Sequence, residues 1–160
     1  MAISQAPPLL LLLLVSLFFF PALGGLTRFG NCSSTQSARA NSVDISPNPV
    51  KRSGNANFTI TGYTRKAIPG EASVELIFVT DLYTMTKNYS LCDITACPVS
   101  PGPFVLTIRN VFRTRLQKRV PQYRVGLRIM EKTVKEPIMC IGFYCKFSGS
   151  VLELSQAFTW

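Results

Sequence analysis

The sequence predicts an all-β fold, a sandwich of two antiparallel sheets. Short stretches from residue 43 onward alternate apolar and polar side chains, the period of a strand with one buried face. Proline and glycine interrupt these stretches at short intervals, as they do between the strands of a sandwich. No stretch shows the periodicity of an amphipathic helix, and no internal repeat is visible. An all-helical or α/β fold is therefore not expected.

Six stretches carry the alternation and are predicted to be strands: 43–45, 57–62, 73–78, 104–109, 123–129 and 139–145. The clearest is 123–129, where every second residue is large and apolar. Residues 26–42 are polar and are expected to be irregular, and no conformation is predicted for 148–160. Parity places the following side chains on the inward face: Phe58, Ile60, Val74, Leu76, Phe78, Leu106, Ile108, Tyr123, Val125, Leu127, Ile129, Ile141 and Phe143.

The N-terminus has the organisation of a secretory signal peptide. Residues 9–20 form an apolar run of twelve residues that contains a single serine, and a proline follows it. Ala22 and Gly24 stand three and one residues before a cleavage point after Gly24. A membrane span needs about 20 apolar residues, so an uncleaved anchor is the weaker alternative. We expect a signal peptide over 1–24, one domain over 25–147 and a tail over 148–160.

Three N-glycosylation sequons agree with secretion. They begin at Asn31, Asn57 and Asn88, and Asn57 falls on the polar face of its predicted strand. Together with the leader, they predict a glycoprotein that is extracellular or vacuolar.

The five cysteines are expected to pair, because the secretory route is oxidising. Zinc is a poor interpretation, since the chain has no histidine and the cysteine spacings suit no common zinc site. A redox pair normally has two residues between its cysteines, whereas Cys92 and Cys97 have four. A local disulfide between Cys92 and Cys97 is the favoured interpretation, and spacing alone leaves the other pairings open.

Catalysis is not expected. Without histidine the chain cannot form a histidine-based triad, and its eight acidic residues show no recognisable catalytic pair. No cofactor or metal is implied.

Basic residues are concentrated between positions 109 and 128, which hold seven Lys or Arg and no acid, in a chain of net charge +9. A charge run is usually a solvated face. The functional alternative is attraction to anionic membranes, and the secretory route argues against nucleic acid. Alternation fails before Pro121, so an exposed, membrane-docking loop is predicted to carry Arg113, Arg115, Lys118 and Arg119. Arg124 and Arg128 are predicted to lie on a sheet face.

Several stretches, in this order along residues 43–147, resemble the ML family of lipid-recognition domains, and most closely its plant-type phosphatidylglycerol/phosphatidylinositol transfer branch. They are Ile45–Val50 (ISPNPV), Phe58–Ile60 (FTI), Leu91–Val99 (LCDITACPV) with Gly102 and Phe104, Pro121–Tyr123 (PQY), and Cys140–Phe143 (CIGF). The combination of the ISPNPV stretch with the later cysteine-proline stretch is fairly specific for this family, whereas either stretch alone is a weak motif.

The resemblance implies an immunoglobulin-like sandwich with an internal lipid cavity between the sheets. It also implies disulfides Cys92–Cys97 and Cys32–Cys140, and it leaves Cys145 without a family counterpart. By pattern alone the inward side chains are an ordinary core. Only the resemblance makes them a lipid-binding wall.

The expected function is therefore that of a secretory-pathway protein, monomeric and non-enzymatic, that binds one sterol or phospholipid and contacts anionic membranes transiently. The alternative is a lipid-sensing interaction module in defence or receptor signalling. A closed sandwich without a ligand is the structural alternative to both.

Overall fold

The computed structural model describes residues 26–32, 34–52, 54–112 and 120–148. Eight strands and one 3₁₀ turn lie in these ranges: β1 Phe29–Asn31, β2 Ala38–Ser46, β3 Asn57–Thr64, β4 Ser73–Val79, β5 Thr84–Ser90, η1 Leu91–Asp93, β6 Gly102–Ile108, β7 Gln122–Met130 and β8 Met139–Lys146. Within the described ranges, no helix has the length and apolarity needed to cross a bilayer. The predicted signal peptide lies outside these residues, and so does the tail beyond Ser148.

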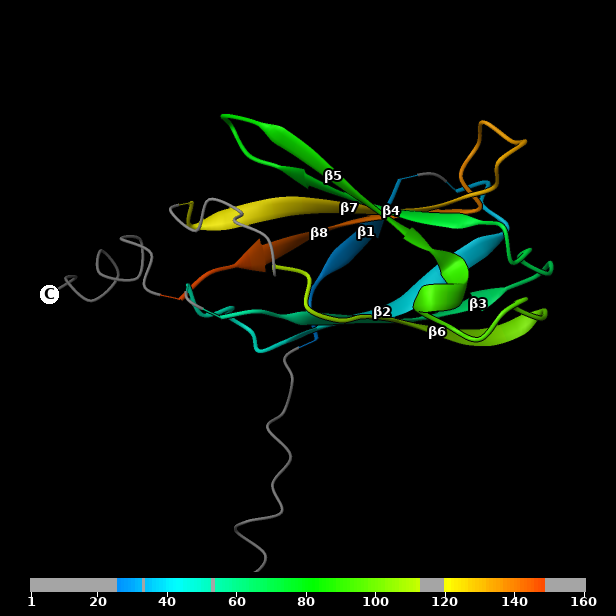
Figure 1. Cartoon of the computed structure of the whole chain (residues 1–160), viewed down its shortest axis with the longest axis horizontal. Coiled ribbons are helices and arrows are strands. Elements are labelled where there is room, and N and C mark those ends of the chain that lie inside the picture. The colour runs from blue at the N-terminus through cyan, green and yellow to red at the C-terminus, as the bar shows by residue number, and fades with distance from the viewer. Residues whose placement is uncertain (1–25, 33, 53, 113–119, 149–160) are drawn as a thin grey trace, which may run out of the picture.

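The strands form two antiparallel sheets that pack face to face (Figure 1). One sheet has five strands in the order β1-β8-β7-β4-β5, and the other has three in the order β2-β3-β6. The predicted all-β sandwich is confirmed.

All six predicted strands are present, but the prediction for residues 26–42 was wrong. This segment contains β1, which pairs with β8 along Phe29–Asn31, and the first five residues of β2. Strand β5 was also missed. It is an edge strand with mostly polar side chains, so the alternation of its three inward residues was not recognised.

The core is formed by the inward faces of both sheets. Every second residue of β3, β4, β6 and β7 is buried, so the period-two pattern of the sequence corresponds to real burial. Gly62 is required inside this core, because an added Cβ would lie 2.5 Å from the Phe104 ring and 2.6 Å from the Arg39 carbonyl oxygen. The missing side chain lets the Phe104 ring cover β3.

The two long sides of the sandwich are closed to different extents. On one side β1 and β8 contact β2, and the Cys32–Cys140 disulfide ties β8 to the segment that joins β1 and β2. The Gln36 side chain adds hydrogen bonds to the Cys140 backbone in both directions. The other side lies between the edge strands β5 and β6, and Figure 1 shows β5 diverging from the three-stranded sheet. The sandwich is therefore firmly joined along one side and more open along the other.

Candidate functional site

The side chains predicted to face inward do lie between the two sheets. All thirteen are buried, each with at most 3% of its surface exposed. The register aligns Leu76, Leu127 and Ile141 in one row across β4, β7 and β8, on the interior side of the larger sheet. The smaller sheet faces them with Phe58, Ile60, Leu106 and Ile108. The sequence thus identified a continuous apolar wall correctly.

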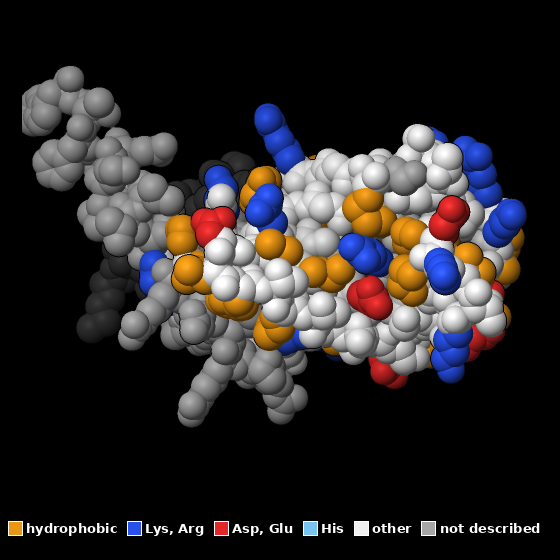
Figure 2. Space-filling model, turned by 90° about the horizontal axis from the view of Figure 1, so that it is seen from above, with side chains coloured by type: hydrophobic (Ala, Val, Ile, Leu, Met, Phe, Trp, Pro, Cys, Tyr) orange, Lys and Arg blue, Asp and Glu red, His pale blue; other side chains and the backbone are white. Residues whose placement is uncertain are grey.

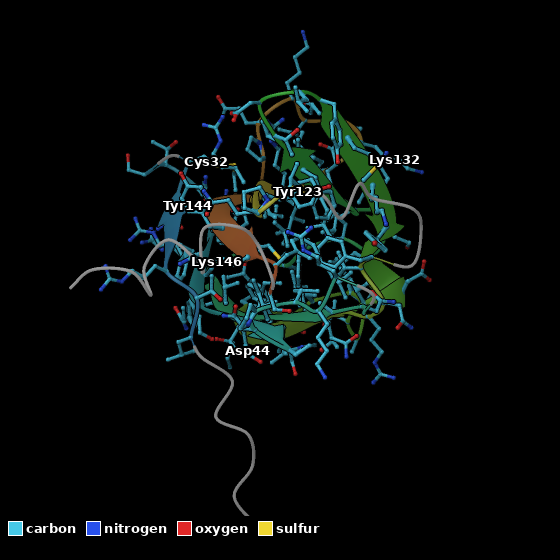
Figure 3. The ribbon with its side chains drawn as sticks, turned by 90° about the vertical axis from the view of Figure 1, so that its left-hand side faces the viewer. Cys32, Asp44, Tyr123, Lys132, Tyr144 and Lys146 are labelled. Carbon is cyan, nitrogen blue, oxygen red and sulfur yellow. A yellow bond between two sulfur atoms is a disulfide. The ribbon has the colours of Figure 1, made fainter. Side chains whose placement is uncertain are left out.

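Aromatic rings fill one end of this interior. Phe112, which follows β6, has its ring centroid 5.1 Å from Phe147 and 5.8 Å from Phe78. Phe58 and Tyr123 complete the group. In Figure 3, Tyr123 lies among the interior side chains, whereas Tyr144 lies at the periphery. Side chains therefore occupy the space between the sheets at this end.

A pair of tyrosine hydroxyls lies at the same end. Tyr83, in the β4–β5 turn, is hydrogen-bonded through its hydroxyl to the hydroxyl of Tyr123 on β7. Burial, followed by this hydrogen bond, raises the pKa of Tyr123 well above its usual range. The Tyr123 hydroxyl therefore remains protonated and neutral at physiological pH, as an apolar interior requires.

Strand β5 contributes three inward residues that the sequence analysis did not include. Met85, Lys87 and Tyr89 pair directly with Phe78, Leu76 and Val74 on β4 and so share their inward face. All three are half-buried, and their neighbours along β5 are exposed. The signal was present as an alternation in Thr84–Ser90, but a lysine at an inward position obscured it.

The gap between the edge strands contains a hollow of about 350 Å³. Tyr89 lines it from β5 and Thr107 from β6, with Arg109 beyond the end of β6 and Asp93 and Ile94 from the short turn. The Cys92–Cys97 disulfide holds this turn in place. Of the residues that line this hollow, Tyr89 belongs to the inward face of β5.

Both disulfides implied by the resemblance are present, namely Cys32–Cys140 and Cys92–Cys97. Cys145 has a free thiol and is fully buried. Burial raises the pKa of this thiol to about 12, so it stays protonated and unreactive at neutral pH.

A larger groove, of about 720 Å³, lies on the outward face of the five-stranded sheet. The register places Gly30, Gly142 and Gly126 side by side on β1, β8 and β7, and the absence of side chains there forms the floor. Arg124 and Arg128 lie on this outward face, as predicted, and line the groove. Figure 2, which views this side of the molecule, shows apolar patches between Lys and Arg side chains. The alternation pattern gave no indication of this groove.

The three sequon asparagines are exposed on strands: Asn31 on β1, Asn57 on β3 and Asn88 on β5. Each position leaves room for a glycan outside the core. The predicted docking residues Arg113, Arg115, Lys118 and Arg119 lie outside the described residues. The described chain ends before them at Phe112, which belongs to the aromatic end of the core, and resumes at Val120, which packs against the core.

Among the described residues, no three His, Cys, Asp or Glu side chains are grouped as a metal site requires. What the interior offers is an apolar wall with few polar groups, arranged for binding by burial.

Comparison with known proteins agrees with this arrangement. The family model described as ML domain matches residues 27–147. The MD-2-related lipid-recognition protein ROSY1 of Arabidopsis thaliana is 48% identical over 159 residues, covering 98% of each chain. The MD-2-related lipid-recognition protein 3 of the same plant is 35% identical over 155 residues, covering 89% of this chain and 93% of its own.

Among solved structures, a Niemann-Pick type C2 protein from Japanese carpenter ant superposes with a TM-score of 0.54 at 14% identity. The match covers 76% of this chain and 99% of the ant protein. At this level of identity the likeness concerns the fold.

Proposed function

This chain belongs to the ML domain family, and we propose that it is a non-enzymatic lipid carrier of the secretory pathway that holds one sterol or phospholipid between its two sheets. The observation that carries the proposal is the uninterrupted apolar wall on the inward faces of β3, β4, β6, β7 and β8. The names of the two plant relatives describe lipid recognition, which supports the same assignment.

Hydrophobic burial would supply the binding energy. Each lipid methylene moved from water into this interior contributes about 0.8 kcal/mol. A single acyl chain or a sterol ring system therefore suffices for useful affinity. Because aromatic side chains fill one end of the interior, part of this energy offsets the separation of the sheets there, and we place lipid entry on the β5–β6 side.

Membrane contact is assigned to the aromatic end. Leu82, in the β4–β5 turn, is 82% exposed, and the predicted docking loop joins the described chain at Phe112 and Val120. An apolar tip combined with basic residues suits a surface of anionic lipid. The exposed sequon asparagines and the predicted signal peptide support a secretory location.

Lipid analysis of the secreted protein tests the proposal. The protein is purified from the medium of a eukaryotic host without detergent, and its extracted lipids are identified by mass spectrometry and quantified against protein. We expect about one lipid per chain, and transfer of a fluorescent sterol or phospholipid between vesicles. Protein that carries no lipid and takes up neither probe would contradict the proposal.

The second candidate is an interaction module that presents lipid to a receptor, and Leu82 is the exposed apolar side chain that such a partner would contact at this end. Vesicle transfer separates the two functions. A carrier exchanges its lipid with vesicles, whereas a presenting module binds lipid and retains it until a protein partner binds near Leu82.

A further inference from the structure

Lys87 is the only charged residue whose side chain faces inward on the described strands. The residue is half-buried on β5, between Met85 and Tyr89, and faces the interior beside Leu76 of β4. Burial lowers the pKa of its ammonium group. An ammonium group on an apolar wall is costly unless it is paired.

The partner of this ammonium group is a neutral carbonyl. Lys87 donates a hydrogen bond of 2.6 Å from Nζ to the backbone oxygen of Val111. No carboxylate among the described residues forms an ion pair with it. A hydrogen bond to an ionised acceptor is about twice as strong as one to a neutral acceptor, so an anion would satisfy Lys87 better than the carbonyl does.

The hydrogen bond also spans the open side of the sandwich. Lys87 lies on the edge strand of the larger sheet, and Val111 follows the edge strand of the smaller sheet by three residues. The Val111 amide is itself bonded to the Ala56 carbonyl, and the Phe112 amide to Asn55 Oδ1, so the segment is anchored to the residues that precede β3. The Lys87–Val111 bond thus joins the two sheets along the same gap that contains the hollow lined by Tyr89 and Thr107.

We propose that Lys87 is the headgroup-binding residue of the lipid site: its ammonium group releases the Val111 carbonyl and pairs with the anionic oxygen of a lipid that enters between β5 and β6. The inference rests on the proposed lipid-carrier function and narrows it to lipids with an acidic group. A phosphodiester or a carboxylate provides the required chemistry. A sterol hydroxyl is a neutral acceptor like the Val111 carbonyl that it would replace, so the exchange adds no binding energy at Lys87.

In this proposal, the ammonium group of Lys87 has one partner in the lipid-free protein, the Val111 carbonyl, and another in the lipid-bound protein, the headgroup. Without lipid, the bond links β5 to the segment that follows β6 across the more open side of the sandwich. With an anionic lipid, the same ammonium group satisfies the headgroup, and the acyl chain lies against the wall beyond it. Arg109 at the hollow adds a second cation, whereas Asp93 opposes an anion there. Lys87 does not line the hollow itself, but it lies on the same inward face of β5 as Tyr89, which does.

The test compares Lys87→Met and Lys87→Arg with the wild-type secreted protein. Methionine is unbranched, keeps most of the length of the side chain and removes the charge, whereas arginine keeps the charge. Lys132→Met, at an exposed lysine in the β7–β8 turn, is the matched control. Delipidated protein is titrated with phosphatidylglycerol, oleate, phosphatidylcholine and cholesterol in competition with a fluorescent lipid, and thermal melts confirm that each variant is folded.

We expect Lys87→Met to weaken binding of the anionic lipids about tenfold or more, because hydrogen bonds to charged groups are the strong ones. Lys87→Arg keeps most of the affinity, and Lys132→Met keeps all of it. Binding of cholesterol, which has no anionic oxygen, changes little, and binding of phosphatidylcholine, whose phosphodiester is offset by its own choline cation, falls less than that of phosphatidylglycerol. A loss confined to phosphatidylglycerol identifies a phosphodiester as the natural group, and a loss confined to oleate identifies a carboxylate.

Equal affinity of wild type and Lys87→Met for both anionic lipids, with lipid binding otherwise intact, would overturn the role of Lys87 and leave the carrier function standing. Failure of the wild-type protein to bind any of the four lipids would overturn both.

Discussion

The hydroxyl groups of Tyr83 and Tyr123 are hydrogen-bonded to each other at the aromatic end of the sandwich. Tyr123 is fully buried on β7, and Tyr83 comes from the turn that links β4 to the edge strand β5. The ring centroids lie 6.3 Å apart in an edge-to-face arrangement. This contact therefore fixes the position of the β4–β5 turn relative to the centre of the larger sheet.

Removal of one hydroxyl should destabilise the fold. Tyr83→Phe is expected to lower the free energy of unfolding by about 1–2 kcal/mol, because the buried Tyr123 hydroxyl loses this partner. The double variant Tyr83→Phe/Tyr123→Phe should recover part of the loss, since both polar groups are then absent. Denaturant unfolding measures the effect. Tyr63→Phe, at a half-exposed tyrosine, is the control and should change stability by less than about 0.5 kcal/mol. Additive single and double effects would contradict a direct coupling.

Leu127 tests whether the apolar wall is the lipid site. It lies at the centre of the row formed with Leu76 and Ile141, and it is fully buried. Leu127→Trp should reduce lipid uptake several-fold by filling the space that the lipid needs, at a cost in stability of about 1–3 kcal/mol. Leu127→Ala removes volume instead and should retain uptake, although it destabilises the fold by about 2–5 kcal/mol.

The matched control for this series is Val105→Trp, on the outward face of β6, which should leave uptake unchanged. Lipid loading is measured by mass spectrometry on variants that melt cooperatively. A folded Leu127→Trp protein with normal loading would remove this position from the site.

The predicted docking loop should control transfer to charged membranes. Reversing Arg113, Arg115, Lys118 and Arg119 to Glu is expected to slow lipid transfer to anionic vesicles and hardly affect neutral ones. Each basic residue near an anionic surface contributes roughly 1 kcal/mol, and the attraction fades beyond about 10 Å at 0.1 M salt. Lipid binding without vesicles should be unchanged, because the inward faces are untouched.

A second set of four reversals gives a control with the same change in net charge. Arg65, Lys66, Lys132 and Lys135 are exposed at the opposite end of the sandwich, after β3 and after β7. Their reversal should slow transfer much less than the loop reversal does. Equal slowing by both sets would show that net charge acts, and equal rates for wild type and loop variant at low salt would exclude docking.

The Cys145 thiol should not react with thiol reagents in the folded protein. The pKa of its thiol is raised to about 12 by burial, so a thiolate-specific reagent at pH 8 should label no cysteine before unfolding and one after it. Because the folded state holds this proton more tightly than the unfolded state, the contribution to stability is complete below about pH 8.5 and is lost as the pH rises toward 12. Cys145→Ser should flatten that decline. Non-reducing peptide mapping that recovers a Cys140–Cys145 peptide would contradict the assignment.

The sequence predicted the strands whose two faces differ most in polarity. In β7, Tyr123, Val125, Leu127 and Ile129 are buried against neighbours from both adjacent strands, so burial and alternation coincide. The thirteen inward residues followed from the same logic.

The features that were missed have different physical origins. Strand β1 is only three residues long and exists through its pairing with β8, a contact far away in sequence. Strand β5 lies at the edge of the sheet and pairs with β4 alone. Its inward side chains are only half-buried, so polar residues are tolerated there. Lys87 was missed for this reason, because an inward lysine breaks the pattern that identifies an inward face.

The exposed edge formed by β5 has a consequence for solubility. An unpaired edge strand presents free backbone amides and carbonyls to which the strand of another molecule can add, and proteins prevent this with polar sequences, inward charges and bulky modifications. Strand β5 has the first two, because it reads TMTKNYS and its central inward side chain is Lys87, and a glycan on the predicted sequon residue Asn88 would supply the third. The strand at which we propose that lipid enters is thus also protected by its sequence against self-association, and a Lys87→Val substitution combined with loss of the Asn88 sequon is expected to turn it into a site of intermolecular β-sheet growth.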